Sequence, residues 1–284
     1  MTVVVTGGTG FLGSALLELL AQRDDVVALH RPGAEPPAMA GVRWLAQDLA
    51  APLGADLPQA ADAVIHLAQS RRYREFPEGV RDVFAVNAGG TVELLDYARR
   101  SGAKAFTYAS SGAVYASGPE PVRETDTPRP GDFYAASKLA GELATEQYRS
   151  LLNAHVLRFF FIYGPGQANM FIPGLLGRLR DEKQVTLAGV DGIHVNPIFV
   201  DDAATAVAAT LDLAESTTLN VAGPDVVSIR DIAALGARLL GSTPRFVLDQ
   251  PQPDLVASIE RLRSLGAAPT VSFDEGLRRT AEAL

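Results

Sequence analysis

The chain has 284 residues, 47% hydrophobic and 20% charged, and its formal net charge of −8 argues against nucleic acid as a partner, because phosphate contacts need a basic surface. It has no cysteine, which excludes disulfides, thiolate metal ligands and a cysteine nucleophile, and we expect no metal site. No apolar stretch approaches the roughly 20 residues that span a bilayer and no signal peptide precedes the first strand, so we expect a cytoplasmic protein with no membrane partner.

Strands and helices are expected to alternate through the first half of the chain. Apolar, β-branched runs predict buried strands, and apolar residues at helical spacing predict the helices between them. The strands are expected at Thr2–Thr6, Val26–His30, Val42–Leu45, Ala63–Ala68, Ala105–Ala109 and Ala154–Ile162. The helices are expected at Leu12–Gln22, Val80–Arg100 and Phe133–Leu151. This alternation is typical of an α/β fold with a doubly wound, parallel Rossmann-type sheet and helices on both faces.

The pattern changes after Tyr163, where Gly164-Pro165-Gly166 interrupts the chain. Further helices are expected at Phe171–Arg180, Asp201–Leu213 and Ser228–Leu240, and short strands near Val185–Leu187 and Pro197–Val200. Proline and glycine then accumulate from Gly241 to Pro253, and two short helical patterns end the chain. We expect a first domain over residues 1–162, whose sheet is completed by parts of residues 190–222. Residues 163–284 would mostly form a smaller, substrate-binding C-terminal lobe.

Three glycines, Gly7, Gly10 and Gly13, separate the first expected strand from the first expected helix. Their spacing permits a tight turn, a close approach of the backbone to a phosphate, and close packing of the helix on the strand. The free N–H groups and the positive end of the helix would bind the phosphates. The segment therefore predicts a dinucleotide-binding loop, in which Phe11 and Leu12 accompany the glycines.

The end of the second expected strand indicates which dinucleotide is bound. A protein that binds NAD usually has a carboxylate there for the ribose 2′-hydroxyl, whereas this chain has His30 followed by Arg31. A guanidinium favours the additional phosphate of NADP, although a solvated surface arginine is the alternative. We therefore expect NADP in preference to NAD as the cofactor, and the first domain would be a dinucleotide-binding domain.

A tyrosine and a lysine four residues apart, Tyr134 and Lys138, would share one face of a helix. A phenol works as a general acid–base when its pKa falls from about 10 towards neutrality, and a neighbouring ammonium acts in that direction. A serine of the pair Ser110-Ser111, at the end of the fifth strand, would stabilise charge on a substrate oxygen. The alternative for the tyrosine and lysine is a plain surface pair on a helix.

These stretches resemble the extended short-chain dehydrogenase/reductases, also called the NAD-dependent epimerase/dehydratase family, and the resemblance covers essentially the whole chain. It is carried by Thr6–Gly13, Asp48-Leu49, His66–Ala68, Asn87 with Gly90-Thr91, Ser110–Tyr115, Tyr134–Lys138, Tyr163–Gln167, Val200–Asp202 and Asp274–Leu277. The resemblance implies that Tyr134 is the acid–base, that Lys138 binds the nicotinamide ribose and lowers the pKa of the tyrosine, and that Ser111 is the catalytic serine. It also implies cofactor contacts from Asp48, Leu49, Leu67, Ala68 and Asn87, with a polar residue on a helix face as the alternative for Asn87.

The residues after Ser111 bear on the reaction. Dehydratases of the family usually place an Asp-Glu pair there, whereas this chain has Gly112 and Ala113, which disfavours dehydration. The leading hypothesis is an oxidoreductase that acts on a ketone or secondary alcohol of a sugar or sugar-like small molecule. The alternatives are a sugar or nucleotide-sugar epimerase, and a non-catalytic NADP-binding sensor. The intact serine, tyrosine and lysine argue against the sensor.

The usual anchors of a nucleotide-sugar diphosphate are absent from the positions that the resemblance gives them. Phe161 stands in place of an asparagine, and Val195 and Pro251 stand in place of two arginines. Losing these anchors would cost several kcal/mol, at about 1.5–3 kcal/mol per charge-assisted hydrogen bond. Either other cations substitute for them or the substrate is not a nucleotide sugar; the candidate cations are Arg178, Arg180 and Arg245.

Three residues are the expected substrate contacts: Phe161, His194 and Asn196. For His194 the alternative is a purely structural histidine. The family also commonly forms dimers through two long helices of each subunit, which in this chain would be Val80–Arg100 and Phe133–Leu151. The resemblance therefore implies a homodimer.

Overall fold

The structure is a computed structural model that describes residues 1–284. The chain forms two compact units, and each of them is assembled from separate stretches of sequence. The first unit comprises Met1–Ala116, Thr127–Arg158 and Ala204–Leu219. The second unit comprises Ser117–Asp126, Phe159–Ala203 and Asn220–Leu284. The chain therefore leaves the first unit after Arg158 and returns to it for residues 204–219.

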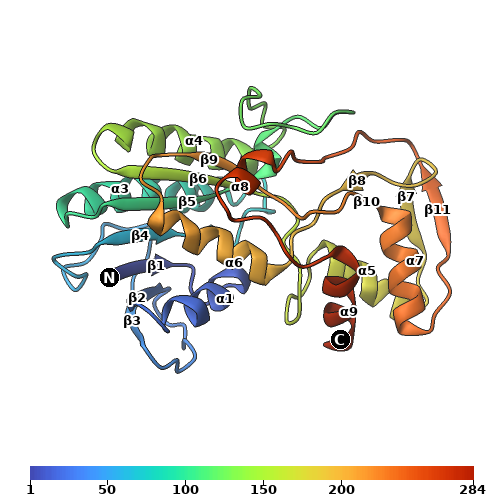
Figure 1. Ribbon diagram of the computed structural model, residues 1–284, viewed down its shortest axis with the longest axis horizontal. Helices are drawn as coiled ribbons and strands as arrows, with labels where there is room; N and C mark the ends of the chain where they lie inside the picture. The colour runs from blue at the N-terminus through green and yellow to red at the C-terminus, as the bar shows by residue number, and fades with distance from the viewer. The chain divides into compact units, whose positions relative to one another are not determined.

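A seven-stranded sheet has the order β3-β2-β1-β4-β5-β6-β9 (Figure 1). Its strands are β1 (Thr2–Thr6), β2 (Asp25–His30), β3 (Val42–Ala46), β4 (Ala63–His66), β5 (Ala105–Ser111), β6 (Asn153–Phe159) and β9 (Thr218–Val221). The pairs of β1 with β2 and β4, of β2 with β3, and of β4 with β5 are all parallel. The order reverses direction between β1 and β4, as in doubly wound sheets. The predicted fold class is confirmed.

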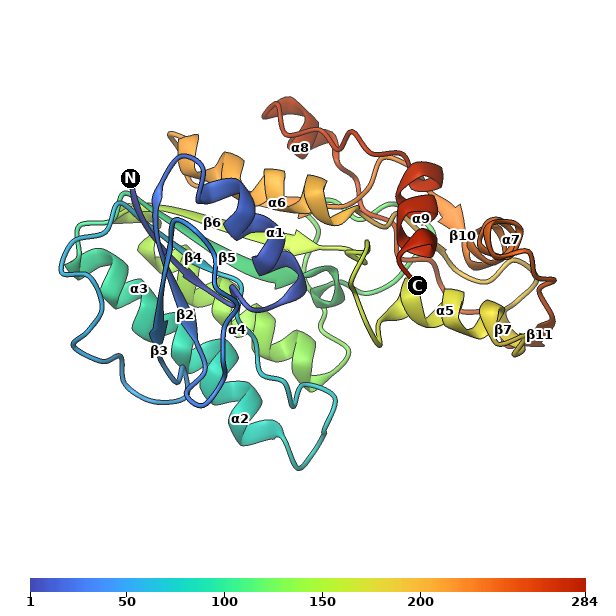
Figure 2. The same ribbon diagram turned by 90° about the horizontal axis from the view of Figure 1, so that it is seen from below.

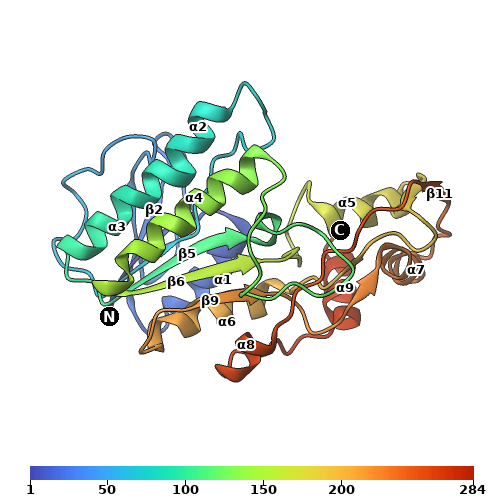
Figure 3. The same cartoon turned by 90° about the horizontal axis from the view of Figure 1, so that it is seen from above.

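Helices cover both faces of the sheet in the first unit. One face carries α2 (Val80–Phe84), α3 (Gly90–Arg100) and α4 (Phe133–Gln147), as Figure 3 shows. The other face carries α1 (Phe11–Leu20) and the later part of α6 (Val200–Ala209), which are seen in Figure 2. A π-helical turn over Ala85–Gly89 joins α2 to α3, so the helix expected over residues 80–100 is continuous but locally widened. No helix combines the length and the apolarity that crossing a bilayer requires.

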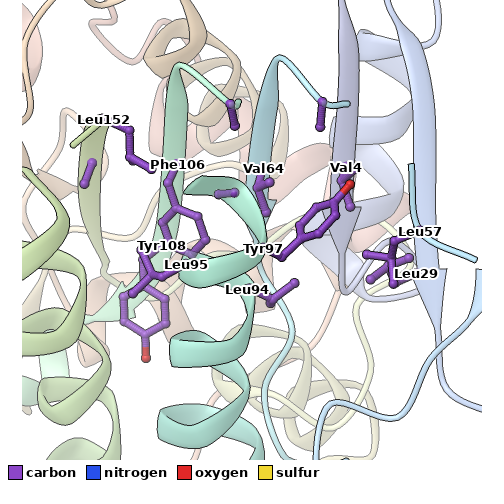
Figure 4. Close-up of a cluster of buried hydrophobic side chains, with 14 of the residues drawn as sticks. Val4, Leu29, Leu57, Val64, Leu94, Leu95, Tyr97, Phe106, Tyr108 and Leu152 are labelled. Atoms are coloured by element: carbon purple, nitrogen blue, oxygen red, sulfur yellow. The ribbon is translucent and has the colours of Figure 1, made fainter. Parts of the chain in front are cut away.

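The core between the sheet and α3 explains why these elements lie where they do (Figure 4). Its members come from neighbouring strands and from one face of α3, and all of them are buried. They include Val4, Leu29, Val64, Leu94, Leu95, Tyr97, Phe106 and Tyr108. Burying a large apolar side chain contributes about 1.5–3 kcal/mol. This packing holds the carboxyl ends of β1, β4 and β5 beside one another, where the loops of the site begin.

The second unit contains α5 (Phe171–Arg180), α7 (Ile229–Leu240), α8 (Glu260–Ser264) and α9 (Phe273–Glu282). It also holds two small sheets, one in which β8 (His194–Val195) pairs antiparallel with β10 (Val227–Ser228), and one in which β7 (Val185–Ala188) pairs parallel with β11 (Phe246–Asp249). Ser228 begins α7 with a capping box: its hydroxyl accepts from the Asp231 N–H, and the Asp231 carboxylate reaches back to the Ser228 backbone.

In this half of the chain the element predictions were wrong for one strand, and they did not include β8, β10 and β11. The run Pro197–Val200 is not a strand: it is buried in irregular backbone, with Phe199 in an isolated bridge to Tyr163, and Val200 begins α6. A buried irregular segment needs the same apolar side chains as a buried strand, so its composition does not separate the two. Strand β11 was missed because it lies within the stretch rich in proline and glycine.

Candidate active site

The loop between β1 and α1 is built so that only glycine fits at two of its positions. A Cβ atom at Gly7 would lie 2.7 Å from the backbone nitrogen of Ala68, and one at Gly13 would lie 2.1 Å from the carbonyl oxygen of Gly7. Gly7 also has a φ of +76°, in the left-handed region that favours glycine. The loop therefore passes close to the end of β4, and α1 packs closely on the loop.

The first turn of α1 is free to bind an anion. Its N-cap residue, Gly10, has no side chain to bond the first N–H groups, and no acidic residue lies in the first turn. The amides of Phe11, Leu12 and Gly13 consequently have no side-chain acceptor, and the helix dipole places partial positive charge there. A cradle of glycines in front of an uncapped helix N-terminus fits the pyrophosphate of a dinucleotide.

Four more of the expected cofactor residues lie at or just after the ends of β2 and β3. His30 closes β2, its ring Nδ1 lies 3.0 Å from the carbonyl oxygen of Arg31, and Arg31 is exposed. After β3, a carboxylate oxygen of Asp48 accepts from the Ala50 N–H at 2.9 Å, and Leu49 follows it. The ring of Trp44, in β3, lies edge-on to the His30 ring with centroids 6.2 Å apart. Sequence reasoning missed Trp44, which has no motif around it.

The end of β4 lies directly beside the glycine loop. The hydroxyl of Thr6 lies 2.7 Å from Nδ1 of His66 and accepts from the Ala68 N–H at 3.2 Å. Burial lowers the pKa of His66 to about 3, so the ring is neutral in the folded protein. These bonds join β1 to β4 and hold Leu67 and Ala68 next to Gly7.

The structure brings the three predicted catalytic residues together on two neighbouring elements. Ser111 ends β5, and its hydroxyl accepts from the Ala113 N–H at 3.2 Å. Tyr134 is the second residue of α4, which begins at an N-cap aspartate. Lys138 lies one turn further along α4, where its ammonium donates to the carbonyl oxygen of Ala109 at 2.8 Å. The phenol of Tyr134 donates to Gln69 at 3.1 Å.

The pKa of the Tyr134 phenol differs from the expectation. Burial raises it to about 12, and a hydrogen bond with the Ser111 hydroxyl opposes this shift only in part. Burial also lowers the pKa of Lys138 to about 7, with the Glu142 carboxylate acting in the opposite direction. In the protein alone, burial rather than the ammonium therefore sets the pKa of the tyrosine. The reason is that both groups are removed from water, which disfavours the charged form of each.

Asn87 lies in the π-helical turn and is completely buried. Its side-chain oxygen accepts from the Ser70 N–H at 2.8 Å, and its side-chain nitrogen donates to the Ser137 hydroxyl at 3.0 Å. Both ends of the amide are thus used within the protein. Asn87 thereby connects the loop after β4 to α4, and its contact with the cofactor stays a prediction.

A buried ion pair that sequence reasoning missed lies behind the catalytic residues. Nη2 of Arg158, in β6, lies 2.6 Å from Oε2 of Glu142 in α4, and their side chains are 4% and 1% exposed. Ser110 donates to the same carboxylate, and Arg158 donates to the Tyr115 hydroxyl at 2.5 Å. The signals in the sequence were an arginine inside an apolar strand and a glutamate one helical turn after Lys138.

In the second unit, Phe161 has an unusual backbone conformation. Its φ is +45°, a region that bulky side chains rarely adopt, and its ring centroid lies 5.6 Å from that of Phe171. Such conformations cost about 1–3 kcal/mol and gather at ligand sites. Val195, at one of the two positions where an arginine was expected by resemblance, is completely buried, so no charged anchor stands there.

The other two expected substrate contacts have partners within the second unit. His194 is half-exposed, and its Nδ1 lies 3.2 Å from a carboxylate oxygen of Asp254. Asn196 is 2% exposed, and its amide donates to the carbonyl oxygen of Ala257 and accepts from the Ala257 N–H, both at 2.9 Å. These bonds use both ends of the Asn196 amide, and its contact with a substrate stays a prediction.

The three arginines that were candidates to replace the missing anchors have local partners. Arg178 donates to the carbonyl oxygen of Gln184 at 2.9 Å and 2.5 Å, and Arg180 lies 3.4 Å from the carboxylate of Asp181. Arg245 lies 3.7 Å from an oxygen of Glu182. The three arginines therefore bind different partners and share no polar contact.

With this geometry, the chain can be compared with known proteins. A family model described as "NAD dependent epimerase/dehydratase family" matches residues 3–222. The chain belongs to this family. It is 32% identical to UDP-glucuronate 4-epimerase from Thermodesulfobacterium geofontis over 231 residues. This match covers 77% of this chain and 71% of that protein. It is 35% identical to GDP-6-deoxy-D-mannose reductase from Pseudomonas aeruginosa over 214 residues. That match covers 69% of this chain and 65% of the reductase.

Solved structures of the epimerase/dehydratase family share the fold. MoeE5 in complex with UDP-glucuronic acid and NAD is 27% identical, with a TM-score of 0.84 over 100% of this chain and 98% of that chain. The relatives named above are an epimerase and a reductase, so this chain is an enzyme of the NAD-dependent epimerase/dehydratase family.

Proposed function

We propose that this enzyme transfers a hydride between a nicotinamide dinucleotide and a ketone or secondary alcohol of a sugar or sugar-like small molecule. The observation that carries the proposal is the grouping of a serine hydroxyl, a phenol and a lysine at the end of β5 and the start of α4. They lie in the same compact unit as the glycine loop that fits a pyrophosphate. We assign the dinucleotide to the first unit and the substrate mainly to the second.

Each catalytic side chain then has a distinct task. Tyr134 gives a proton to the carbonyl oxygen as it is reduced, and takes that proton back in the reverse direction. The hydroxyl of Ser111 donates to the same oxygen and stabilises the negative charge that develops there. Lys138, with a pKa of about 7, holds the nicotinamide ribose through its amino group. The bound nicotinamide ring supplies or accepts the hydride, and in its oxidised form it adds a positive charge.

We propose NADP in preference to NAD. Support comes from the end of β2, where no carboxylate stands to bond a ribose 2′-hydroxyl and the exposed guanidinium of Arg31 follows His30. An arginine binds a phosphate through two parallel hydrogen bonds, which suits the 2′-phosphate of NADP. MoeE5 was solved with NAD. The proposed preference for NADP therefore rests on the residues at the end of β2 in this chain and not on the likeness to MoeE5. The remaining cofactor contacts that we propose are Gly7, Gly10, Phe11, Leu12, Gly13, Asp48, Leu49, Leu67 and Ala68.

The substrate differs, we propose, from a nucleotide sugar held by its diphosphate. Phe161 presents a ring where the resemblance expects an amide, and Val195 is buried where it expects an arginine. Apolar side chains cannot replace charge-assisted bonds to a diphosphate. Phe161 and His194 remain the substrate contacts of this proposal.

Epimerisation is the second candidate function. It is favoured by the similarity to UDP-glucuronate 4-epimerase and by the likeness to MoeE5, which was solved with UDP-glucuronic acid. An epimerase returns the hydride to the other face of the same carbon, so it keeps its cofactor bound through many turnovers. A reductase exchanges the cofactor in each turnover.

Two measurements separate these functions: the identity of any nucleotide that stays bound during purification, and the net oxidation of NADPH or NADH. The purified enzyme would be denatured and any released nucleotide identified, and then NADPH and NADH oxidation would be followed with a panel of keto-sugars. Protein without a retained nucleotide that oxidises NADPH faster than NADH supports the proposed reductase. Retained NAD, with interconversion of UDP-glucuronic acid and its epimer, would establish the second candidate. Absence of both activities over the whole panel would contradict the proposal.

We also propose a homodimer formed by the outer face of α2, α3 and α4 (Figure 3). Three large apolar side chains of these helices are exposed: Phe84 by 55%, Val92 by 47% and Leu143 by 53%. Apolar groups gathered on one face of adjacent helices are typical of a protein interface. A two-fold axis would pair this face with its copy.

A further inference from the structure

The phenol of Tyr134 has a polar neighbour that belongs to none of the recognised motifs. Its hydroxyl donates to the side-chain oxygen of Gln69 at 3.1 Å, and both side chains are partly buried. Gln69 lies in the loop after β4, 65 residues before the tyrosine in sequence. A side chain within bonding distance of the acid–base oxygen is also within reach of a substrate oxygen that bonds to the same phenol.

Hydrogen bonds hold this loop in place against α4. Ser70, next to Gln69, donates its N–H to the side chain of Asn87 at 2.8 Å and its hydroxyl to Asp82. The Asn87 amide donates to the hydroxyl of Ser137, which in turn donates to the backbone carbonyl of Tyr134 at 2.7 Å. A continuous chain of bonds therefore links the residue after Gln69 to the residue that carries the phenol.

Two ring contacts bind the same loop to the start of α4. The ring of Tyr73 lies 5.1 Å from that of Tyr134, and the ring of Phe76 lies 6.0 Å from that of Phe133, between centroids. Aromatic pairs at such distances contribute about 0.5–1.5 kcal/mol each. The loop that carries Gln69 is therefore held against α4 by contacts that do not include the bond between Gln69 and Tyr134.

We propose that Gln69 is a fourth polar side chain of the catalytic site, which positions the phenol of Tyr134 and donates a hydrogen bond to the substrate oxygen that exchanges a proton with it. An amide suits this task because it carries an acceptor and a donor side by side. Its oxygen accepts from the neutral phenol, and rotation about the last side-chain bond presents its nitrogen to an oxygen that carries negative charge. The inference rests on the proposed hydride transfer, because it assigns a contact to that reacting oxygen.

The groups that face the phenol determine how the inference is tested. They are Tyr73 on the loop after β4, Asp132 at the N-cap of α4, and Tyr108 and Ser111 of β5. A carboxylate in place of the Gln69 amide would add a negative charge beside the phenol, and it could accept but not donate a hydrogen bond. It would therefore disfavour the phenolate.

Two variants separate positioning from packing. Gln69→Leu keeps the volume and removes the amide, and we expect kcat to fall about tenfold, the effect of a lost hydrogen bond to a charged group, with cofactor affinity unchanged. Gln69→Glu should move the apparent pKa of the pH–rate profile upward by about one unit or more. Gln22→Glu, which adds the same charge in the exposed turn after α1, is the matched control and should leave the profile unchanged.

A second readout does not need the substrate. The ionisation of Tyr134 would be followed by ultraviolet absorbance in the NADP complex, with Tyr134→Phe as the reference that identifies its signal. Gln69→Glu should raise the pKa of that signal. Unchanged kcat in Gln69→Leu, together with an unmoved titration in Gln69→Glu, would overturn the inference. If the wild-type enzyme transferred no hydride, the proposed function would fail, and the titration would still show whether Gln69 controls the phenol.

Discussion

At the scale of single residues, Tyr134 occupies a partly buried position between groups from three elements. Ser111 comes from β5, Gln69 from the loop after β4, and Lys138 from the next turn of α4. Burial raises the pKa of the phenol to about 12, so the protein alone keeps it protonated at neutral pH. A protonated phenol is the form that can act as an acid in the reduction of a carbonyl group.

Replacing Tyr134 by phenylalanine tests its role as acid–base. The change removes the hydroxyl and keeps the ring that packs on Tyr73. Turnover should fall by a factor of about 100–10,000, the usual contribution of general acid–base catalysis, while the dissociation constant of the cofactor stays nearly unchanged. Steady-state kinetics and cofactor titration give the two quantities. Wild-type turnover in this variant would remove Tyr134 from the role.

Only part of the residue-level picture was accessible from sequence. Tyr134 and Lys138 were singled out because their spacing is that of a helix face, and Ser111 was chosen from the pair Ser110-Ser111 by the resemblance to the family. Gln69 and Trp44 were missed since neither has a characteristic spacing, and each acquires its neighbours through chain folding. The backbone partners of Asn196 were not predicted, because a buried amide bonded to backbone and an amide bonded to a ligand look the same in sequence.

At the scale of elements, the glycine loop and α1 act as one unit. The carbonyl oxygen of Gly7 would lie 2.1 Å from a Cβ atom at Gly13, a distance that forces the helix away from the loop. The N–H groups at the start of α1 and the backbone of the loop both have to face the same pyrophosphate. We therefore expect a displacement of either element to lower the affinity for the cofactor more than it lowers the rate of hydride transfer.

Gly13→Ala should reduce the affinity for the dinucleotide by about tenfold or more, because a 1 Å displacement of a binding group can cost a factor of up to about 100. The matched control is Gly177→Ala in α5, where a Cβ atom meets nothing within 4 Å. Alanine there should leave cofactor affinity unchanged and stabilise the helix by about 0.5–1 kcal/mol. Isothermal titration and urea unfolding supply the measurements. Equal cofactor affinities for the two variants would contradict this role of the loop.

The buried pair of Glu142 and Arg158 connects three elements at once, since it joins α4 to β6 and also bonds Ser110 of β5. Glu142→Leu leaves the guanidinium buried without a counter-charge, and should lower the free energy of unfolding by about 3–5 kcal/mol. The double variant Glu142→Leu with Arg158→Met should recover most of that loss, because both charges are then gone. Urea unfolding of the single and double variants measures this. A double variant no more stable than Glu142→Leu would contradict this prediction, because the loss of stability would then not come from the unpaired charge of Arg158.

At the scale of the whole molecule, two buried histidines make stability depend on pH. Burial lowers the pKa of His66 to about 3, and burial with the nearby Arg149 lowers that of His155 to about 4. In the unfolded chain both have the ordinary value of 6.5. Their neutral forms stabilise the fold fully above that value, and the stability is lost as pH falls from 6.5 towards 4 and 3, because the unfolded chain then binds protons that the folded protein does not.

Between pH 6.5 and about pH 5 each histidine should lower the free energy of unfolding by about 2 kcal/mol, because one pH unit corresponds to about 1.36 kcal/mol. His155→Leu should remove about half of this pH dependence. Urea unfolding at about pH 7.5 and about pH 5 gives the difference in stability for the wild-type protein and the variant. A wild-type protein equally stable at the two values would disprove the prediction.

The proposed dimer is also a property of the whole molecule. Leu143→Lys places a charge in the centre of the outer face of α4, and it should yield a monomer in sedimentation equilibrium, because a buried charge without a partner is costly. Leu239→Lys is the control, since Leu239 is exposed by 39% on α7 and lies outside the proposed interface. If both variants sediment as the wild type does, then the face of α3 and α4 is not the interface.

The sequence by itself determined the doubly wound sheet and the cofactor loop of this enzyme. Both depend on local order along the chain: apolar runs of strand length, helical spacing, and glycines between β1 and α1. The tertiary structure alone decided what surrounds the catalytic phenol, the partners of Asn87 and Asn196, and the pairing of Glu142 with Arg158. These contacts join segments far apart in sequence, and burial, which sets the pKa values of Tyr134 and Lys138, exists only once those segments have packed together.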